Sequence, residues 1–272
     1  MTHTYLCPLR WGDLDAQGHV NNASYLDYLQ EARVDFLLSG PPIMQRLLDT
    51  GVLVVSHQVE YLHPIHFSEE PIRIELWVDS IGASRFSIGY ELFSGEPLVA
   101  RARTGAAPFD LASNSLRRLL PEERVALEAV HAPGQPLSPL PRAGRHESGH
   151  SYPLRVRWSD LDSYGHVNNV KYYDYIQEAR IALMSQVLEW SAEDVWVIVR
   201  QDMEYLKPID FRTEPYEVRT VVAAIGQRSF TLAVDINDPG SGTVFATART
   251  VVVGQAPLSN TARSRLESWS LV

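Results

Sequence analysis

The sequence predicts an α+β protein of two tandem units, each with one long helix packed on an antiparallel sheet. Three observations support this fold class. Residues 11–33 recur at 158–180 with 16 of 23 positions identical, so a domain-sized piece is duplicated. Each copy has an apolar stripe at helical spacing, and strand-like runs of alternating apolar and polar residues follow it. A helix and a sheet are expected to bury their apolar faces on each other.

The repeat continues downstream of this block, which sets the expected domain boundaries. Residues 60–65 (EYLHPI) match 204–209 (EYLKPI), and the offset drifts only from 147 (160 − 13) to 144 (204 − 60). Residues 117–130 are expected to form a short amphipathic helix closing the first unit, and 131–150 are rich in Pro, Gly and Ser. The sequence therefore predicts a first unit over 1–130, a linker over 131–150 and a second unit over 151–272.

The long helix is expected over 23–39 in the first copy. Asn21 and Asn22 precede it, where an N-cap belongs, and Gly40 and two prolines follow it. Its apolar stripe recurs at i, i+3, i+4, i+7 and i+11, at Tyr25, Tyr28, Leu29, Ala32 and Phe36.

Period-two alternation indicates the strands, most clearly over 72–78. The first unit is expected to have strands at about 52–62, 72–78, 84–93 and 97–107. The matching runs of the second unit are about 195–206, 215–225, 228–237 and 243–253. One more strand is expected before each motif, ending at Trp11 and Trp158.

Composition limits the function classes. The net charge of −9 argues against a general nucleic-acid or membrane-surface binder, which needs a basic face. The single cysteine, Cys7, cannot form an internal disulfide, which fits a reducing cytoplasm. No signal peptide is visible at the start of the sequence, and no apolar run approaches the roughly 18 residues of a membrane span. We therefore expect a cytoplasmic protein.

Each copy carries a dense polar motif before its helix. The motif pairs Asp-Leu-Asp with a Gly-His-Val-Asn-Asn turn. Its residues are Asp13, Asp15, Gly18, His19, Asn21 and Asn22 in the first copy and Asp160, Asp162, Gly165, His166, Asn168 and Asn169 in the second. A helix N-terminus offers unpaired N–H groups and a partial positive charge, and glycine lets the backbone approach a ligand. This combination can polarise a carbonyl while a carboxylate delivers water.

On these residues, the chain resembles the hotdog-fold thioesterases of the 4-hydroxybenzoyl-CoA thioesterase type. The tandem arrangement is also similar to plant acyl-carrier-protein thioesterases. The resemblance implies a double hotdog in which the units pair, with each Asp working at the helix N-terminus of the other copy. It implies that Asp15 and Asp162 are catalytic, with His19 and His166 as partners. In some relatives a Glu opening a later strand is catalytic, and Glu60 and Glu204 are the matching candidates here.

Alternatives stay open at this point. An Asp-x-Asp can simply order a turn, and we keep that reading for Asp13 and Asp160. The carboxylate could act as general base or as nucleophile through an anhydride. Another enzyme on the same fold (a hydratase, dehydratase or acyltransferase), or an acyl-CoA binder without catalysis, are the competing functions.

The expected substrate is an acyl-CoA or acyl-ACP. Neither a nucleic acid nor a membrane is expected as a partner, and homo-oligomers are plausible because sheet edges often pair. No cofactor is expected, and no metal, because His57, His63 and His66 lack a zinc-site spacing with cysteines. The copies differ beside the acid, where Gln17 aligns with Tyr164, so unequal sites are expected.

Overall fold

The computed structural model describes residues 2–110, 113, 115–135, 137, 140, 148–188 and 195–270. It divides into two compact units, Met1–Ser138 and Pro139–Val272, so the division falls inside the expected linker. The expected pairing of the units stays a prediction.

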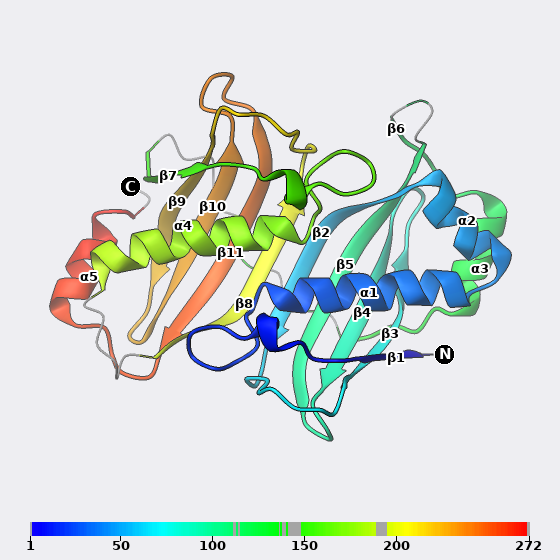
Figure 1. Ribbon diagram of the computed structural model, residues 1–272, viewed down its shortest axis with the longest axis horizontal. Coiled ribbons are helices and arrows are strands. Elements are labelled where there is room, and N and C mark those ends of the chain that lie inside the picture. Colours follow the sequence, from blue (N-terminus) through cyan, green and yellow to red (C-terminus); the bar gives the residue numbers. More distant parts are fainter. Residues whose placement is uncertain are drawn as a thin grey trace. The chain divides into compact units, whose positions relative to one another are not determined.

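The first unit has a long helix and an antiparallel sheet, as expected. Its elements are β1 (His3–Cys7), α1 (Ser24–Ser39), α2 (Pro42–Thr50), β2 (Val52–Tyr61), β3 (Ile72–Ile81), β4 (Phe86–Phe93), β5 (Leu98–Asp110), β6 (Ser115–Leu116) and α3 (Pro121–Ala129). The sheet order is β1-β3-β4-β5-β2, and β6 pairs with β5. In Figure 1, α1 crosses the strands of its own unit.

The second unit repeats this arrangement. Its elements are β7 (His150–Leu154), α4 (Lys171–Val187), β8 (Trp196–Tyr205), β9 (Tyr216–Ile225), β10 (Ser229–Asn237), β11 (Val244–Gly254) and α5 (Asn260–Glu267). The sheet order is β8-β11-β10-β9-β7, and α4 crosses its strands (Figure 1). The α+β fold class and the repeat of one fold are therefore confirmed.

The predicted periodicities locate the core of the first unit. The stripe residues of α1 are all buried, and so are Leu26 and Leu37, which makes the buried face wider than one stripe. On β3, Ile72, Ile74, Leu76 and Val78 are at most 1 % exposed, while the residues between them are less buried. Each such side chain contributes about 1.5–3 kcal/mol when fully buried, so this helix–sheet contact carries much of the stability.

Several boundaries differ from the prediction. The first strand ends at Cys7 rather than Trp11, because Pro8 donates no backbone hydrogen bond and residues Trp11–Asp13 form a 3₁₀ turn. The corresponding strand of the second unit ends at Leu154, before the 3₁₀ turn Trp158–Asp160. The expected helix over 117–130 begins only at Pro121, which suits a first helical position.

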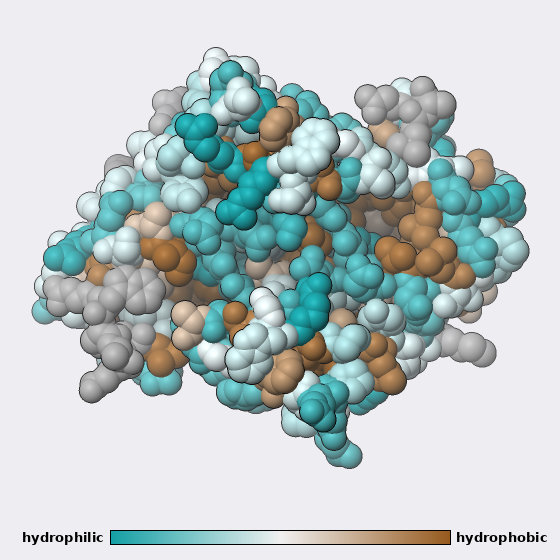
Figure 2. All heavy atoms as spheres, in the orientation of Figure 1, coloured by the Kyte–Doolittle hydropathy of each residue, from teal (hydrophilic) through white to brown (hydrophobic). Residues whose placement is uncertain are grey.

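Helices α2 and α5 were not predicted. The prolines after α1 were expected only to end that helix, but proline also suits the first position of a helix and begins α2. Met44 and Leu47 of α2 are buried at helical spacing. In Figure 2, apolar surface lies beside α2 and the C-terminal half of α1, where Leu38 is 55 % exposed.

The start of the expected linker is bound to the first unit. His131 forms a parallel bridge with Val78, and Ala132 N–H donates to the Val78 carbonyl at 3.0 Å. Gly134 N–H donates to the Asp79 carboxylate at 3.1 Å. The chain therefore stays attached to β3 for several residues beyond α3.

No helix in the described part of the chain combines the length and the apolar character that crossing a membrane requires.

Cys7 lies at the end of β1 and is 5 % exposed. Burial raises the pKa of its thiol to about 11, although Arg10 nearby acts in the opposite direction. At pH 8 only about one thiol in a thousand is then the reactive thiolate.

We expect Cys7 to react slowly with a thiol reagent at pH 8 in the native protein, and fully once denaturant exposes it. Labelling with and without denaturant, followed by mass spectrometry, measures this. Rapid labelling of the folded chain would contradict the burial.

Candidate active site

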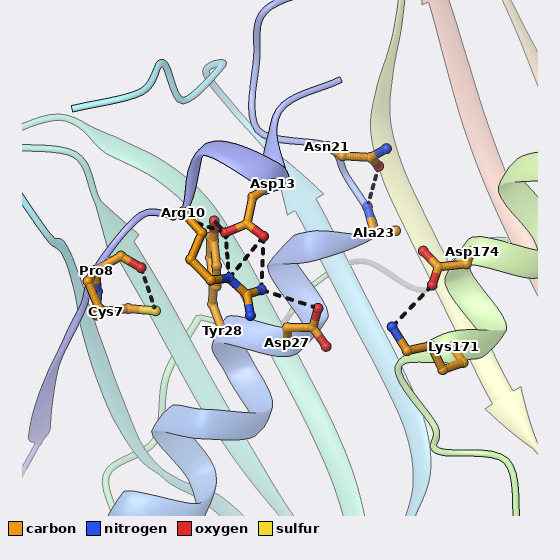
Figure 3. Close-up of polar contacts among 10 residues, drawn as sticks. All are labelled: Cys7, Pro8, Arg10, Asp13, Asn21, Ala23, Asp27, Tyr28, Lys171 and Asp174. Carbon is orange, nitrogen blue, oxygen red and sulfur yellow. Dashed lines mark hydrogen bonds and ion pairs between the residues drawn. The ribbon is translucent and has the colours of Figure 1, made fainter. Parts of the chain in front are cut away.

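The two aspartates of the Asp-x-Asp motif have different surroundings. Asp13 is 6 % exposed and accepts a 2.7 Å hydrogen bond from the Tyr28 hydroxyl on α1. Arg10 pairs with the same carboxylate at 2.9 Å (Figure 3). Burial alone would raise the pKa of Asp13, but the hydrogen bonds from Arg10 and Tyr28 hold that pKa below its ordinary value. Asp13 thus ties the loop to the helix.

Asp160 repeats this anchor in the second unit. It is 6 % exposed and accepts from the Tyr175 hydroxyl at 2.7 Å and from Arg157 N–H at 2.8 Å. The structural interpretation of Asp13 and Asp160 is therefore confirmed.

Asp15 is half-buried at the tip of the loop, and only one of its oxygens is held. Its Oδ1 accepts from the N–H groups of Gln17, at 2.8 Å, and His19, at 3.2 Å. Among the described residues, none donates a hydrogen bond to Oδ2. One oxygen therefore fixes the side chain and the other is open to a ligand.

The backbone around Asp15 closes a tight turn. Asp15 N–H donates to the His19 carbonyl at 2.8 Å, and Gly18 N–H donates to the Asp15 carbonyl at 3.0 Å. Gly18 has φ 77°, a conformation that L side chains rarely adopt. The glycine is thus required by the turn itself.

Asp162 stands in an equivalent turn. Its Oδ1 accepts from Tyr164 N–H at 2.9 Å, and Gly165 has φ 81°. Tyr164 differs from its counterpart Gln17, and its own pKa is raised by burial and then by the charge of Asp162. The second carboxylate therefore has an aromatic side chain, Tyr164, where the first has Gln17.

Each loop leads directly into the start of its helix. Asn21 Oδ1 accepts from Ala23 N–H at 2.9 Å, and Asn168 Oδ1 accepts from Val170 N–H at 3.2 Å. The N-cap residues are Ala23 in α1 and Val170 in α4, and neither makes a side-chain capping bond, so each Asn lies two residues before the cap. Asn21 and Asn168 thus order the turn ahead of each helix rather than cap the helix itself, and their contact with a ligand stays a prediction.

A strand residue pins the helix start in both units. The Tyr61 hydroxyl donates to the Asn22 carbonyl at 2.9 Å, and the Tyr205 hydroxyl donates to the Asn169 carbonyl at 2.8 Å. Sequence reasoning missed this contact, although the Glu-Tyr dipeptide recurs in both copies. The Oδ1 atom of Asn169 is itself buried and accepts no hydrogen bond from the described residues.

The two histidines of the motif face different partners. His19 bridges to His66, and the two rings lie 4.9 Å apart between centroids. His166 bridges to Asp210, and its Nε2 lies 3.7 Å from a carboxylate oxygen. The copies therefore differ here as well as at Gln17 and Tyr164.

The glutamate candidates lie apart from this group. Because Tyr61 points at the helix start and side chains alternate along a strand, Glu60 is directed to the opposite face of the sheet. Glu204 precedes Tyr205 in the same way and is exposed. The structure thus gathers Asp, Gly, His and Asn of each motif at one helix start and directs Glu60 and Glu204 away from it.

Within the described ranges, no group of three or more His, Cys, Asp or Glu side chains is arranged to hold a metal ion.

A long helix on an antiparallel sheet, repeated in tandem with the same Asp–Gly–His–Asn loop before each helix, is the architecture of a hotdog-fold thioester hydrolase. The chain belongs to the thioesterase-like superfamily, whose family model matches residues 9–137 and 156–255.

Individual relatives agree with this family. The chain is 30 % identical over 128 residues to the 1,4-dihydroxy-2-naphthoyl-CoA hydrolase of Nostoc punctiforme, covering 46 % of this chain and 85 % of that protein. Two solved structures share the fold across both units. The 12:0-ACP thioesterase of Umbellularia californica has a TM-score of 0.76 at 14 % identity, covering 93 % of this chain and 94 % of its own. An acyl-ACP thioesterase of Bacteroides thetaiotaomicron has a TM-score of 0.69 at 15 % identity, covering 93 % and 97 %.

We expect Tyr28→Phe and Tyr175→Phe each to lower the free energy of unfolding by about 1–3 kcal/mol, because each leaves a buried carboxylate short of a donor. Ionised Asp13 stabilises the fold at pH values above the unfolded-state Asp pKa of about 3.9, and this stabilisation is lost as the pH falls through the lower pKa of the folded state. The loss of unfolding free energy caused by Tyr28→Phe should therefore shrink in acid. Denaturant unfolding between pH 2 and pH 7 measures this.

Tyr152→Phe on β7 is the matched control, since its half-buried hydroxyl has no hydrogen-bond partner in the described structure. Equal effects of all three changes would contradict the anchor.

Proposed function

We propose that the chain hydrolyses acyl-CoA thioesters, with Asp15 and Asp162 as the catalytic carboxylates. One observation carries the assignment. In each unit the loop holds one oxygen of the second aspartate, and the other oxygen has no donor among the described residues. The first aspartate is buried in each unit: Asp13 receives donors on both oxygens, whereas Asp160 receives both of its donors on Oδ2.

The proposed reaction takes a thioester and water to a carboxylic acid and a thiol. Acting as general base, the open oxygen of Asp15 removes a proton from water while the water oxygen attacks the carbonyl carbon. Helix N–H groups stabilise the negative charge that develops on the carbonyl oxygen. The carbon–sulfur bond then breaks, and the leaving thiolate takes up the proton.

Direct attack by the same oxygen is the competing route, and it passes through an anhydride that water cleaves. A single turnover in ¹⁸O-labelled water tests the anhydride route. Label in the Asp15 or Asp162 carboxylate shows an anhydride that water cleaves at the Asp carbonyl, because the general-base route labels only the released acid.

The other motif residues are assigned supporting roles. Gly18 and Gly165 allow the turn, and His19 and His166 close it through their backbone groups. Asn21 and Asn168 fix the helix start beside the carboxylate. The expected contact of Asn169 with the substrate stays a prediction, since its Oδ1 is shielded from solvent in this structure.

CoA is proposed as the thiol because a relative of 30 % identity is by name a CoA hydrolase. Acyl-ACP is the second candidate, favoured by acyl-ACP thioesterases that match both units, although that likeness shows the fold alone. We also propose a cytoplasmic location, in keeping with the free thiol of Cys7. Association into homo-oligomers remains an expectation from the sequence.

We expect Asp15→Asn and Asp162→Asn each to lower turnover, and the double variant to lose about 10²–10⁴-fold, as for loss of a general base. Thiol release from a panel of acyl-CoAs measures the rate, and thermal unfolding checks that the fold persists.

Asp49→Asn, at an exposed position of α2, serves as control and should leave turnover unchanged. Wild-type turnover by the double Asp variant would refute the assignment.

We expect the two sites to be unequal, because Tyr164 and Asp210 stand where the first unit has Gln17 and His66. Such differences shift transition-state binding by about 1–3 kcal/mol, or roughly tenfold to two-hundredfold in rate. The single Asp variants, compared at saturating substrate, should lose unequal shares that vary with the acyl group.

Changing Tyr164 to Gln in the Asp15→Asn background should then move the acyl preference of the remaining site. Equal losses of one half for every acyl group would show two equivalent sites instead.

A further inference from the structure

Each unit exposes an edge-to-face pair of aromatic side chains beside its Asp loop. Trp11 is 73 % exposed and meets Phe67, 42 % exposed, edge to face, with ring centroids 5.2 Å apart. Trp158, 74 % exposed, meets Phe211, 43 % exposed, in the same way at 5.5 Å. These rings are therefore exposed to solvent, and packing in a hydrophobic core does not account for them.

The loop itself holds the pair in place. Trp11 begins the 3₁₀ turn that ends at Asp13, and Leu14 N–H donates to the Trp11 carbonyl at 3.4 Å. On the other side, Val20 N–H donates to the Ile65 carbonyl at 2.8 Å, and His66 bridges to His19, which places Phe67 against the same loop. The pair is thus fixed by the backbone that fixes Asp15.

Chain length limits how far the pair can be from the carboxylate. Asp15 is four positions after Trp11, which sets an upper limit of about 14 Å between their Cα atoms, and the 3₁₀ turn shortens this distance. The pair therefore lies within reach of the substrate atoms that follow the reacting thioester.

The size of the pair indicates a small ligand group. A stable protein partner covers about 800 Å² of each surface, whereas one large aromatic side chain covers about 150–250 Å². The faces of Trp and Phe are apolar and the indole N–H is a donor, which suits a ligand with both methyl and amide groups.

We propose that Trp11–Phe67 and Trp158–Phe211 bind the pantetheine arm of the substrate. This inference rests on the proposed function. The gem-dimethyl carbon of the arm packs on the indole face, and an arm carbonyl accepts from the indole N–H. Because CoA and the acyl carrier protein present the same arm, the pair serves either source, and it discriminates against thioesters that lack the pantoate portion.

The test compares wild type with Trp11→Ala/Trp158→Ala and with the conservative Trp11→Phe/Trp158→Phe. One acyl group is presented on CoA, on pantetheine, on an acyl carrier protein and on N-acetylcysteamine, which lacks the pantoate portion. We expect the Ala variant to lose roughly tenfold in kcat/KM, mostly through KM, on the first three thioesters and to keep its rate on the fourth. The Phe variant should recover part of the loss.

Val125→Ala on α3, 66 % exposed, is the matched control for removing an exposed apolar side chain. An equal loss on all four thioesters would mean that the pair only shapes the loop. A loss confined to acyl-CoA would mean recognition of the nucleotide, and one confined to the carrier protein would mean a protein contact. Each of these results overturns the inference.

Failure of the proposed function shows separately, as absence of turnover by the wild-type chain on every thioester. Calorimetry with free pantetheine then decides the inference by itself. Binding by wild type that the Ala variant loses supports it, and equal binding, or none by either, overturns it.

Discussion

The buried carboxylate of Asp13, repeated at Asp160, is the constraint on which the site depends. Burying a carboxylate is costly unless hydrogen-bond donors surround it. The Tyr28 hydroxyl, on the N-terminal half of α1, supplies a donor that no residue of the loop replaces. Satisfying this group therefore requires loop and helix to be in register. Once they are, the second aspartate two residues later has a fixed position relative to the helix start.

Duplication preserved this anchor and let its surroundings change. Both units keep the Asp–Tyr bond at 2.7 Å, the positive-φ glycine and the strand tyrosine that pins the helix start. The differences lie in residues next to this anchor: the second unit has Tyr164 and Asp210 where the first has Gln17 and His66. Residues that hold the site together are thus separate from residues that surround the reacting group. Such a division allows the two loops to acquire different preferences without loss of either fold.

Local periodicity explains why much of the fold was predictable. The helix over 23–39 and the strands over 52–62 and 72–78 match α1, β2 and β3 within a few residues, because each buries one face. The misses have physical causes. The prolines between α1 and α2 were expected to end a helix, but proline is also well suited to begin one, and α2 begins there. The attachment of His131 to Val78 is a contact between distant segments, which carries no local pattern.

The same distinction applies to the site. The motif itself indicated Asp15, Gly18 and His19, but not their geometry. The bonds from Tyr28 to Asp13 and from Tyr61 to Asn22 span 15 and 39 residues, so only the folded chain reveals them. Side chains alternate between the two faces of β2. If Tyr61 had been predicted to face the helix, the sequence would therefore have placed Glu60 on the opposite face.

Under the proposed function, the two aspartates of one motif contrast a structural carboxylate with a catalytic one. Asp13 receives donors on both oxygens, and its lowered pKa makes it a weak base with no lone pair directed outward. Asp15 has amide donors on one oxygen only, which fixes the side chain while the other oxygen stays open. If Asp15 were bound as fully as Asp13, the loop would be more rigid but chemically inert. If it were not bound at all, the carboxylate would be mobile, and misplacement by about 1 Å can cost a hundredfold in rate. Partial satisfaction by the loop's own N–H groups meets both needs, and the neighbouring Asp13 carries the stability that Asp15 therefore does not have to supply.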